Sequence, residues 1–354
     1  MLIIIRFNPL LFFITQKNKK FTFAKKTSLI LDTAIFSISS QKQFEKTALK
    51  IFRFQYENNS VYKEFCDLLK TNVFQVKTLQ QIPFLPIQFF KTHAVILDDK
   101  EANITFASSG TTGMITSKHM IIDINLYEES YRKGFSQFYG NIESFVVLAL
   151  LPSYLERKGS SLIYMVEDLI RLSNSPESGF YLNNHDDLIE KLGQLEAAGQ
   201  NVLLIGVTYA LLDLIEKKQF QLKNTIIMET GGMKGKRKEM IREELHQQLC
   251  AGFGVSSIHS EYGMTELLSQ AYSLGEGLFE CPSWMQILIR DTEDALNYVT
   301  DGKTGGINVI DLANINSCSF IATQDLGKKH FNGIFEVLGR FDNSDVRGCN
   351  LMVI

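Results

Sequence analysis

The chain has 354 residues, of which 45% are hydrophobic and 21% charged, with a formal net charge of −3. These values exclude the collagen-like, disordered and polytopic membrane classes, and the length predicts about two domains of roughly 150 residues each. A nearly balanced charge gives no general attraction to nucleic acid or to acidic membranes. We therefore expect no nucleic-acid partner, and any bound anion must be held by a local site.

The N-terminal residues 2–15 form an apolar run that is interrupted by Arg6, Asn8 and Pro9 and followed by many lysines. The run is shorter than the roughly 18–20 residues that span a bilayer, so no transmembrane segment is expected. A signal peptide carries its positive charge before the apolar run, whereas most of the charge here follows it. We expect residues 1–40 to be an extension that is poorly ordered or comes from an upstream start codon. A signal peptide and a basic interfacial anchor are the less favoured alternatives.

From about residue 40 onward the hydrophobic pattern becomes regular. Apolar residues at helical spacing predict helix within 48–69, and two prolines make 82–90 a rigid extended connection. Strands are predicted at 103–108, 118–123, 145–151, 201–207, 224–229, 285–290, 306–312 and 334–339, and helices at 126–138, 160–173, 186–199, 208–218 and 235–250. The alternation of strands and helices predicts an α/β fold with a largely parallel sheet. After residue 284 strands follow without long helices, which predicts a β-rich subdomain.

The five cysteines occur at wide spacing, and no CxxC, HxxxH or HExxH pattern is present. A disulfide framework and a structural zinc site are therefore not expected, and a reducing cytoplasm is the compartment that fits best. The five are Cys66, Cys250, Cys281, Cys318 and Cys349.

The most specific local pattern is a stretch rich in glycine and hydroxyl side chains between two predicted strands. Glycine lets the backbone approach a ligand closely, and N–H groups and hydroxyls can then converge on an anion. The stretch lacks the GxxxxGK[ST] pattern of a Walker loop. We expect a phosphate clamp at a hairpin, with an ordinary turn as the alternative. Its residues are Ser108, Ser109, Gly110, Thr111, Thr112 and Gly113.

This stretch resembles the phosphate loop of the adenylate-forming superfamily, which includes acyl- and aryl-CoA ligases. EYGMTE at 261–266 resembles the superfamily's YGxTE element, ATQDLG at 322–327 its Thr/Gly–Asp segment, and LGRFD at 338–342 its GRxD hinge. The four elements occur in the order typical of the superfamily. The loop departs from the usual pattern because its lysine, Lys118, comes later than the Pro-Lys that normally follows.

Longer segments at 151–165, 229–240, 261–272 and 339–352 resemble the LuxE-type acyl-protein synthetases, which activate fatty acids for a luminescence-associated reductase. This resemblance covers roughly residues 45–354. It implies an adenylate-forming domain over 41–342, with mixed or parallel sheets, flanking helices and a β-rich subdomain. The small C-terminal domain usual in the superfamily would be lacking, and a tail at 343–354 would follow.

The resemblance gives roles to single residues of these elements. Glu266 would hold Mg²⁺, a hard cation that takes carboxylate and phosphate oxygens, and Thr265 would contact phosphate. Tyr262 would present a flat face to adenine beside Gly263, and Asp325 would accept hydrogen bonds from the ribose hydroxyls. Each acid also has an ordinary interpretation, as a capping or turn residue.

Further residues follow from the same resemblance. Arg340 carries a planar fork of donors that fits phosphate or ribose oxygens, with a surface salt bridge as the alternative. Gly231 and Gly232 follow a predicted strand and would line the nucleotide and acyl pocket. Lys118 or Lys234 would have to supply the cation that the missing small domain carries elsewhere in the superfamily.

Cys349 stands near the end of the chain, in the segment VRGCNLM. By the resemblance it is the cysteine that becomes acylated. Arg347 would favour the thiolate, and Gly348 would let the segment move. The alternative is a small buried hydrophobe, which is the expectation for the other four cysteines.

The resemblance implies an enzyme that uses ATP and Mg²⁺ to activate a fatty acid, of long chain by preference, or another carboxylate as acyl-AMP. The acyl group would pass to Cys349 as a thioester and then to an acyl-accepting reductase or transferase. Two alternatives stay open: an acyl- or aryl-CoA ligase-like enzyme with a diffusible acceptor, and a non-catalytic nucleotide- or acyl-binding subunit.

Overall fold

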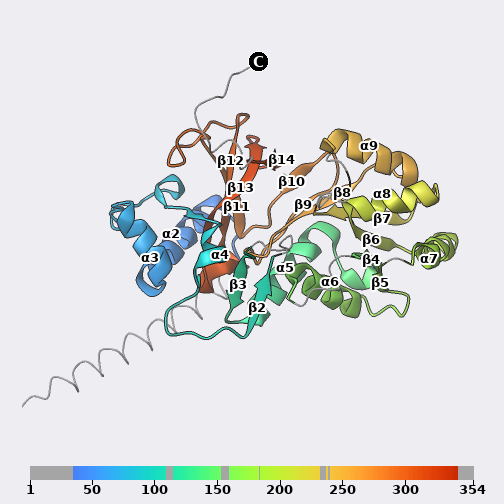
Figure 1. The fold of residues 1–354 in the computed structure, drawn as a ribbon, viewed down its shortest axis with the longest axis horizontal. Helices are drawn as coiled ribbons and strands as arrows, with labels where there is room; N and C mark the ends of the chain where they lie inside the picture. Colours follow the sequence, from blue (N-terminus) through green and yellow to red (C-terminus); the bar gives the residue numbers. More distant parts are fainter. Residues whose placement is uncertain are drawn as a thin grey trace, which may run out of the picture.

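The computed structural model describes residues 35–108, 115–152, 159–182, 184–231, 237 and 240–341 (Figure 1). None of the helices in these ranges is long and apolar enough to cross a membrane. The helices are α2 (Gln41–Asn58), α3 (Ser60–Leu68), α4 (Phe89–Thr92), α5 (Ile124–Tyr139), α6 (Ser161–Leu172), α7 (His185–Ala197), α8 (Thr208–Lys217) and α9 (Arg242–Phe253), with the 3-10 turns η1 (Leu79–Gln81), η2 (Ile142–Ser144) and η3 (Leu312–Asn316).

A twelve-stranded mixed sheet and a two-stranded hairpin, β2–β3, make up the β-structure of the described chain. The order in the large sheet is β11-β12-β13-β14-β10-β9-β8-β7-β6-β4-β5, and β1 pairs with β13. The strands are β1 (Leu85–Pro86), β2 (Ile104–Ala107), β3 (Lys118–Ile121), β4 (Val146–Leu150), β5 (Gly179–Tyr181), β6 (Val202–Val207), β7 (Thr225–Thr230), β8 (His259–Tyr262), β9 (Ala271–Ser273), β10 (Leu278–Glu280), β11 (Met285–Arg290), β12 (Thr304–Asp311), β13 (Phe320–Lys329) and β14 (Phe335–Arg340).

One half of the large sheet is parallel. Strands β5, β4, β6, β7 and β8 pair in this sense, and every residue of β4 and β6 is buried. Helix α6 packs on β4, and α8 packs on β6 and β7. In Figure 1, α8 and α9 lie on one side of these strands, and α5 and α6 lie on the other. The predicted α/β fold with strands buried on both faces is confirmed.

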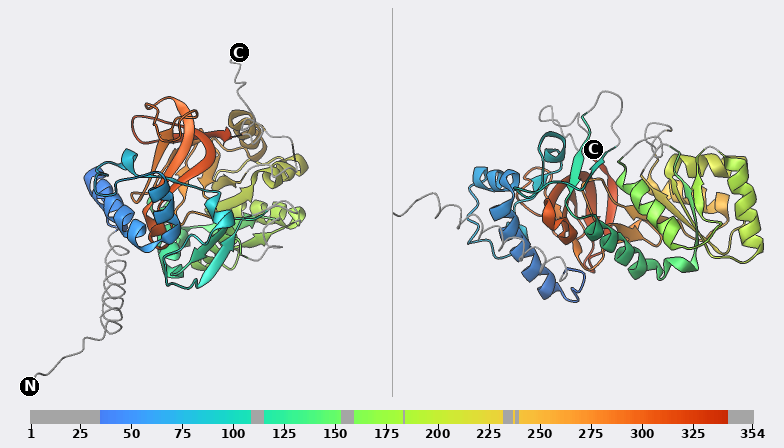
Figure 2. Two further views of the ribbon diagram at one scale, coloured as in Figure 1. Left: turned by 60° about the vertical axis from the view of Figure 1, so that its left-hand side comes forward. Right: turned by 90° about the horizontal axis from the view of Figure 1, so that it is seen from below.

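The other half of the sheet is antiparallel. Strands β9, β10, β14, β13, β12 and β11 pair in this sense, which confirms the predicted β-rich subdomain. Figure 2 shows β11–β14, in orange and red, beside the blue helices α2 and α3. The two halves form one sheet because β10 pairs with both β9 and β14.

The predicted helix within 48–69 is two helices, which meet at Asn59. The side-chain oxygen of Asn59 accepts a hydrogen bond from the N–H of Tyr62 at 3.0 Å and so caps α3. Its amide nitrogen donates to the carbonyl of Ser317 at 2.8 Å, and this bond ties the junction to the β-rich half. The predicted connection at 82–90 holds the short strand β1 and then turns into α4, and the predicted helix 235–250 begins, as α9, only at Arg242.

The described chain joins the hydrophobic core from its first residue. Ile35 is fully buried, and the ring of Phe36 packs edge-on against Trp284 with the ring centres 4.9 Å apart. The segment predicted as an extension, 1–40, therefore contributes its last residues to the core.

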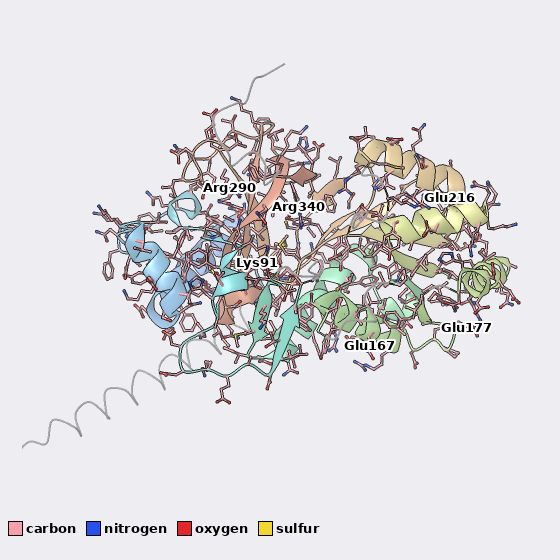
Figure 3. All side chains as sticks on the ribbon, in the orientation of Figure 1. Lys91, Glu167, Glu177, Glu216, Arg290 and Arg340 are labelled. Carbon is pink, nitrogen blue, oxygen red and sulfur yellow. The ribbon has the colours of Figure 1, made fainter. Side chains whose placement is uncertain are left out.

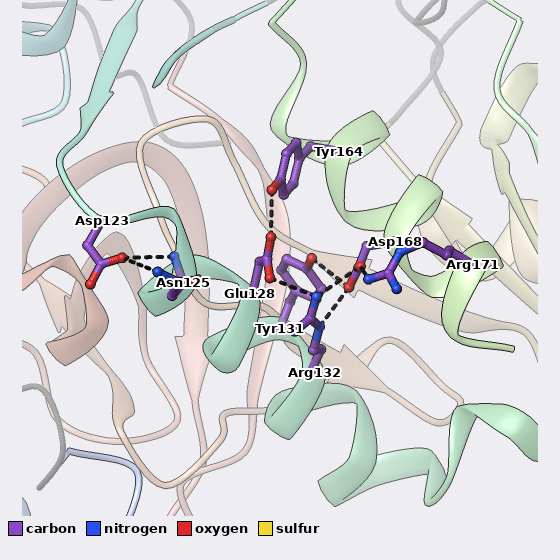
Figure 4. A network of polar contacts seen from close by, with 8 residues as sticks. All are labelled: Asp123, Asn125, Glu128, Tyr131, Arg132, Tyr164, Asp168 and Arg171. Atoms are coloured by element: carbon purple, nitrogen blue, oxygen red, sulfur yellow. Dashed lines mark hydrogen bonds and ion pairs between the residues drawn. The ribbon is translucent and has the colours of Figure 1, made fainter. Parts of the chain in front are cut away.

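A buried carboxylate, Asp168, holds α6 against α5 (Figure 4). Arg132 donates to both of its oxygens, at 2.7 Å from Nε and 2.9 Å from Nη2. The hydroxyl of Tyr131 donates at 2.8 Å, and Arg171 forms a further ion pair. These contacts lower the pKa of the Asp168 carboxyl although burial acts in the opposite direction. The cluster therefore stabilises the packing of α5 against α6, and its residues are separate from the candidate site described next.

Candidate functional site

The predicted phosphate loop lies at a hairpin, as expected from its flanking strands. Strands β2 and β3 pair antiparallel, with Ala107 opposite Lys118. The N–H of Ser108 donates to the carbonyl of Ser117 at 3.0 Å, and the N–H of Ser117 donates to the hydroxyl oxygen of Ser108 at 2.9 Å. Ser108 therefore closes the base of the loop. The loop residues Ser109, Gly110, Thr111, Thr112 and Gly113 lie outside the described residues.

The carboxyl group of Glu266 lies against the base of this hairpin. Glu266 is only 5% exposed, and the side chain of Ser117 forms a hydrogen bond with its carboxyl group. Burial raises the pKa of the Glu266 carboxyl, while Ser117 and the positive charges of Arg340 and Lys91 act to lower it. The structure thus brings the candidate metal ligand to the base of the hairpin that carries the predicted phosphate loop.

The backbone that carries Glu266 is held by buried polar side chains. The amide nitrogen of Asn314 donates to the carbonyl of Glu266 at 2.7 Å. The carboxylate of Asp311 accepts from the N–H groups of Leu268 and Ser269, both at 2.9 Å. Because these bonds fix the backbone at Glu266 and just after it, its carboxyl is held in place before any ligand binds. Sequence patterns did not point to Asp311 or Asn314.

His119 holds the neighbouring residue, Thr265. Its Nδ1 lies 2.9 Å from the carbonyl oxygen of Thr265, so Nδ1 carries the proton and donates. Its Nε2 then accepts from the hydroxyl of Ser317 at 2.8 Å. Burial lowers the pKa of the His119 imidazole to about 4. A neutral histidine thus connects β3 with the segment that carries the candidate phosphate and metal contacts.

This arrangement predicts a pH-dependent stability that depends on His119. The unfolded imidazole binds a proton near pH 6.5, whereas the folded one binds it only near pH 4. Because the unfolded state then binds more protons, the folded state loses up to roughly 3 kcal/mol as the pH falls through this window. We expect urea unfolding of His119→Gln at pH 7, 5.5 and 4.5 to show a clearly smaller loss than the wild type. An equal loss in both proteins would contradict this role.

Three side chains from three strands meet at the other edge of the site. Asp325 on β13 lies opposite Arg340 on β14, and the Arg340 Nε donates to its Oδ1 at 3.0 Å. The hydroxyl of Tyr262 on β8 donates to its Oδ2 at 2.8 Å. The Asp325 side chain is 8% exposed, whereas that of Arg340 is 78% exposed. Asp325 is therefore held in one orientation, while most of the guanidinium stays free to contact a ligand.

The ring of Tyr262 is more covered than a stacking platform requires. It packs edge-on against Phe279 and Phe335, with ring centres 6.0 and 5.7 Å away, and the residue is 9% exposed. Burial raises the pKa of the Tyr262 hydroxyl, which therefore stays a hydrogen-bond donor. In the structure Tyr262 first of all orients Asp325, and only a small part of its ring is available to adenine.

Two of the candidate glycines stand just after strands β7 and β8, at positions that disfavour a side chain. Gly231 has φ +74°, which L side chains rarely adopt. A Cβ on Gly263 would lie 2.2 Å from Oε1 of Glu261, whose other oxygen accepts from the Thr230 hydroxyl at 2.6 Å. A side chain at Gly263 would therefore displace a held carboxylate. Gly232 lies outside the described residues.

Other predicted residues are not brought together with this group. Lys118 is exposed, and by the alternation of β3 it faces away from the side on which His119 contacts Thr265. Lys234 and Cys349 lie outside the described residues. Among the described side chains, no group of three His, Cys, Asp or Glu residues could hold a metal ion. A single carboxylate, Glu266, fits Mg²⁺ when phosphate oxygens and water complete its ligands.

Solved structures of adenylate-forming enzymes share this fold. Residues covering 86% of this chain match 70% of 2-hydroxyisobutyryl-CoA ligase in the postadenylation state with 2-HIB-AMP, at a TM-score of 0.65 and 12% identity. ATP-bound MatB from Rhodopseudomonas palustris matches 67% of this chain at a TM-score of 0.51 and 18% identity, over 47% of its own length. The chain thus spans about half the length of MatB. These likenesses show that the chain has the fold of the adenylate-forming enzymes.

A family model described as "Acyl-protein synthetase, LuxE" matches residues 14–354, so the chain belongs to the LuxE acyl-protein synthetase family. The long-chain-fatty-acid–luciferin-component ligase of Vibrio harveyi is 24% identical over 353 residues, which cover 89% of each chain. The family and the enzyme class predicted from the sequence, an AMP-forming acyl-protein synthetase, are confirmed. The family match begins inside the segment that the sequence analysis sets apart as an extension.

Proposed function

We propose that this protein activates a fatty acid with ATP as an acyl adenylate and then carries the acyl group as a thioester on Cys349. The observation that supports this most is the contact between the loop hairpin and the YGMTE segment: Ser117 hydrogen-bonds to Glu266, and Nδ1 of His119 lies 2.9 Å from the carbonyl oxygen of Thr265. In this proposal the loop, the carboxylate of Glu266 and the carboxylate of Asp325 bind one nucleotide. The 24% identity to a fatty-acid ligase supports the choice of substrate.

In this proposal each element of the site takes one part of the nucleotide. The loop Ser109–Gly113 surrounds the phosphates with Thr265, and Lys118 lies at its end. Asp325 accepts hydrogen bonds from the ribose hydroxyls, and the fixed bond from Tyr262 keeps it in position. Adenine lies near Tyr262, with Gly231, Gly232 and Gly263 leaving room for it.

The reaction would proceed in two halves. A carboxylate oxygen of the fatty acid attacks the α-phosphorus of ATP, the bond to the bridging oxygen breaks, and pyrophosphate leaves with the electron pair. The Cys349 thiolate then attacks the acyl carbon, and AMP leaves as the thioester forms. Glu266 would hold Mg²⁺, which when bound neutralises phosphate charge. Glu266 itself is kept in place by Ser117 and by the backbone contacts around it.

We further propose that residues 41–342 form the adenylating domain and that 343–354 act as a carrier tail. The tail would hand the acyl group to a partner protein, a reductase or transferase that accepts acyl thioesters. An acyl-CoA ligase-like activity with a diffusible acceptor and a non-catalytic binding subunit remain the competing functions.

Intact-mass spectrometry of the full chain, incubated with ATP, Mg²⁺ and a panel of fatty acids, tests the proposal. We expect one acyl mass that hydroxylamine removes and that Cys349→Ser lacks. Cys250→Ser is the matched control, because burial raises the pKa of the Cys250 thiol and disfavours its thiolate. ATP consumption without an adduct in both proteins would instead support a diffusible acceptor. If neither an adduct nor ATP turnover is observed, the result would support a non-catalytic binding subunit.

A further inference from the structure

Adenylation needs positive charge near the phosphates, because breaking the bond to pyrophosphate moves negative charge onto the leaving group. Arg340 is one cation of the site, but its Nε is engaged by Asp325 and its side chain is 78% exposed. Lys118 faces away from the side of β3 on which His119 lies. A second cation beside Arg340 would add to the positive charge that acts on the phosphates.

Helix α4 is anchored at this place in the fold by its neighbours. Strand β1 just before it pairs with β13, the strand that carries Asp325, and the N–H of Ile87 donates to the carbonyl of Ala322 at 2.9 Å. The ring of Phe90 packs edge-on against His119, with ring centres 5.4 Å apart. Because His119 holds the carbonyl of Thr265, α4 packs directly on the residue that positions the YGMTE segment.

Lys91 follows Phe90 on this helix, and its charge is available. In the described part of the chain, no carboxylate lies within ion-pair distance of its ammonium group, and the side chain is only partly buried. Its charge nevertheless acts on the buried carboxyl of Glu266, together with that of Arg340. Figure 3 shows Lys91 on α4 and Arg340 on β14 in the centre of the molecule. The two cations come from different elements, α4 and β14.

We propose that Lys91 is a catalytic residue of the adenylation step: its ammonium group contacts the phosphates of ATP and balances the negative charge that passes to the departing pyrophosphate. The inference rests on the proposed function, since it assigns the cation for that reaction. No proton needs to move, because the ammonium group acts as a fixed charge. Lys91 would thus supply the positive charge for which Lys118 and Lys234 were the candidates from the sequence.

The test compares Lys91→Met, Lys91→Arg and Lys46→Met in the full-length protein. Lys46 is an exposed lysine on α2 and serves as the control. Exchange of labelled pyrophosphate into ATP reports adenylation without any need for the acceptor cysteine. We expect Lys91→Met to lower kcat by about 100-fold with less than about fivefold change in KM for ATP, since the contact strengthens in the transition state. Lys91→Arg should recover part of the loss, and Lys46→Met should match the wild type.

The split between kcat and KM separates this role from a structural one. A positive charge that acts on the transition state changes kcat more than KM for ATP, and Lys91→Arg restores that charge. A purely structural role would instead lower the melting temperature of Lys91→Met, and the arginine would not recover the rate.

Several outcomes would overturn the inference. An exchange rate of Lys91→Met equal to that of the wild type would show that Lys91 is not needed. A lowered melting temperature of Lys91→Met with no recovery of the rate in Lys91→Arg would show a structural role. If the wild type exchanges no pyrophosphate with any carboxylate, the proposed function fails, and this inference fails with it.

Discussion

Replacing Glu266 with glutamine should lower the rate of acyl-adenylate formation by about 100-fold or more. The amide keeps the size of the side chain and can still accept a hydrogen bond from Ser117, but it carries no charge for a hard cation. A single-turnover measurement of acyl-AMP at several Mg²⁺ concentrations checks this. The variant should also need a higher Mg²⁺ concentration to reach half of its maximal rate.

The control for this change is Glu293→Gln, an exposed acid in the loop after β11. It should keep the wild-type rate and the wild-type Mg²⁺ requirement. A variant at Glu266 that forms the adenylate at the normal rate would show that this carboxylate is not part of the reacting site. Because burial raises the pKa of Glu266, we also expect the acid limb of the wild-type rate to lie above the range of an ordinary glutamate.

Replacing Asp311 with alanine should lower the free energy of unfolding by about 3–5 kcal/mol. The side chain is fully buried and accepts four hydrogen bonds of 2.6–3.0 Å, from the N–H groups of Leu268, Ser269 and Ala313 and from the Ser269 hydroxyl. Without the carboxylate these donors stay buried, and those with no second acceptor lose their partner. Urea unfolding at pH 7, followed by circular dichroism, measures the change.

Asp186→Ala is the matched control for this experiment, since Asp186 is an exposed acid in the first turn of α7. Its loss should change the free energy of unfolding by less than about 1 kcal/mol. A similarly small change for Asp311→Ala would mean that Asn314 alone holds the segment, because its Oδ1 also accepts from Leu268 at 3.0 Å.

Each strand predicted from the sequence overlaps a strand of the structure. The agreement is close for β4 and β6, which form continuous apolar runs and were predicted within one or two residues. Strand β8, with the sequence HSEY, and strand β13, which carries Asp325, were not predicted. Both contain polar residues that the site needs, and these residues interrupt the apolar pattern from which strands are predicted.

The residues of the candidate site that the sequence could indicate are those that stand in short local motifs. Glu266, Asp325 and Arg340 stand in short motifs, so the resemblance could point to them. The residues that hold these motifs in place could not be found this way: His119 contacts a carbonyl 146 positions away, and Asn314 donates to a carbonyl 48 positions away. A single histidine or asparagine in a sequence does not indicate such a distant partner.

The pairing of β10 with β14 limits how the two halves of the sheet can move apart. Phe279 and Phe335 are register partners there, and both rings pack against Tyr262, which donates a hydrogen bond to Asp325. A hinge between the two halves would have to separate these rings and break the pairing of β10 with β14. Asp325, the proposed ribose ligand, is therefore held in a fixed position before a nucleotide binds. A nucleotide that binds there would lose little of its binding free energy to ordering this part of the protein.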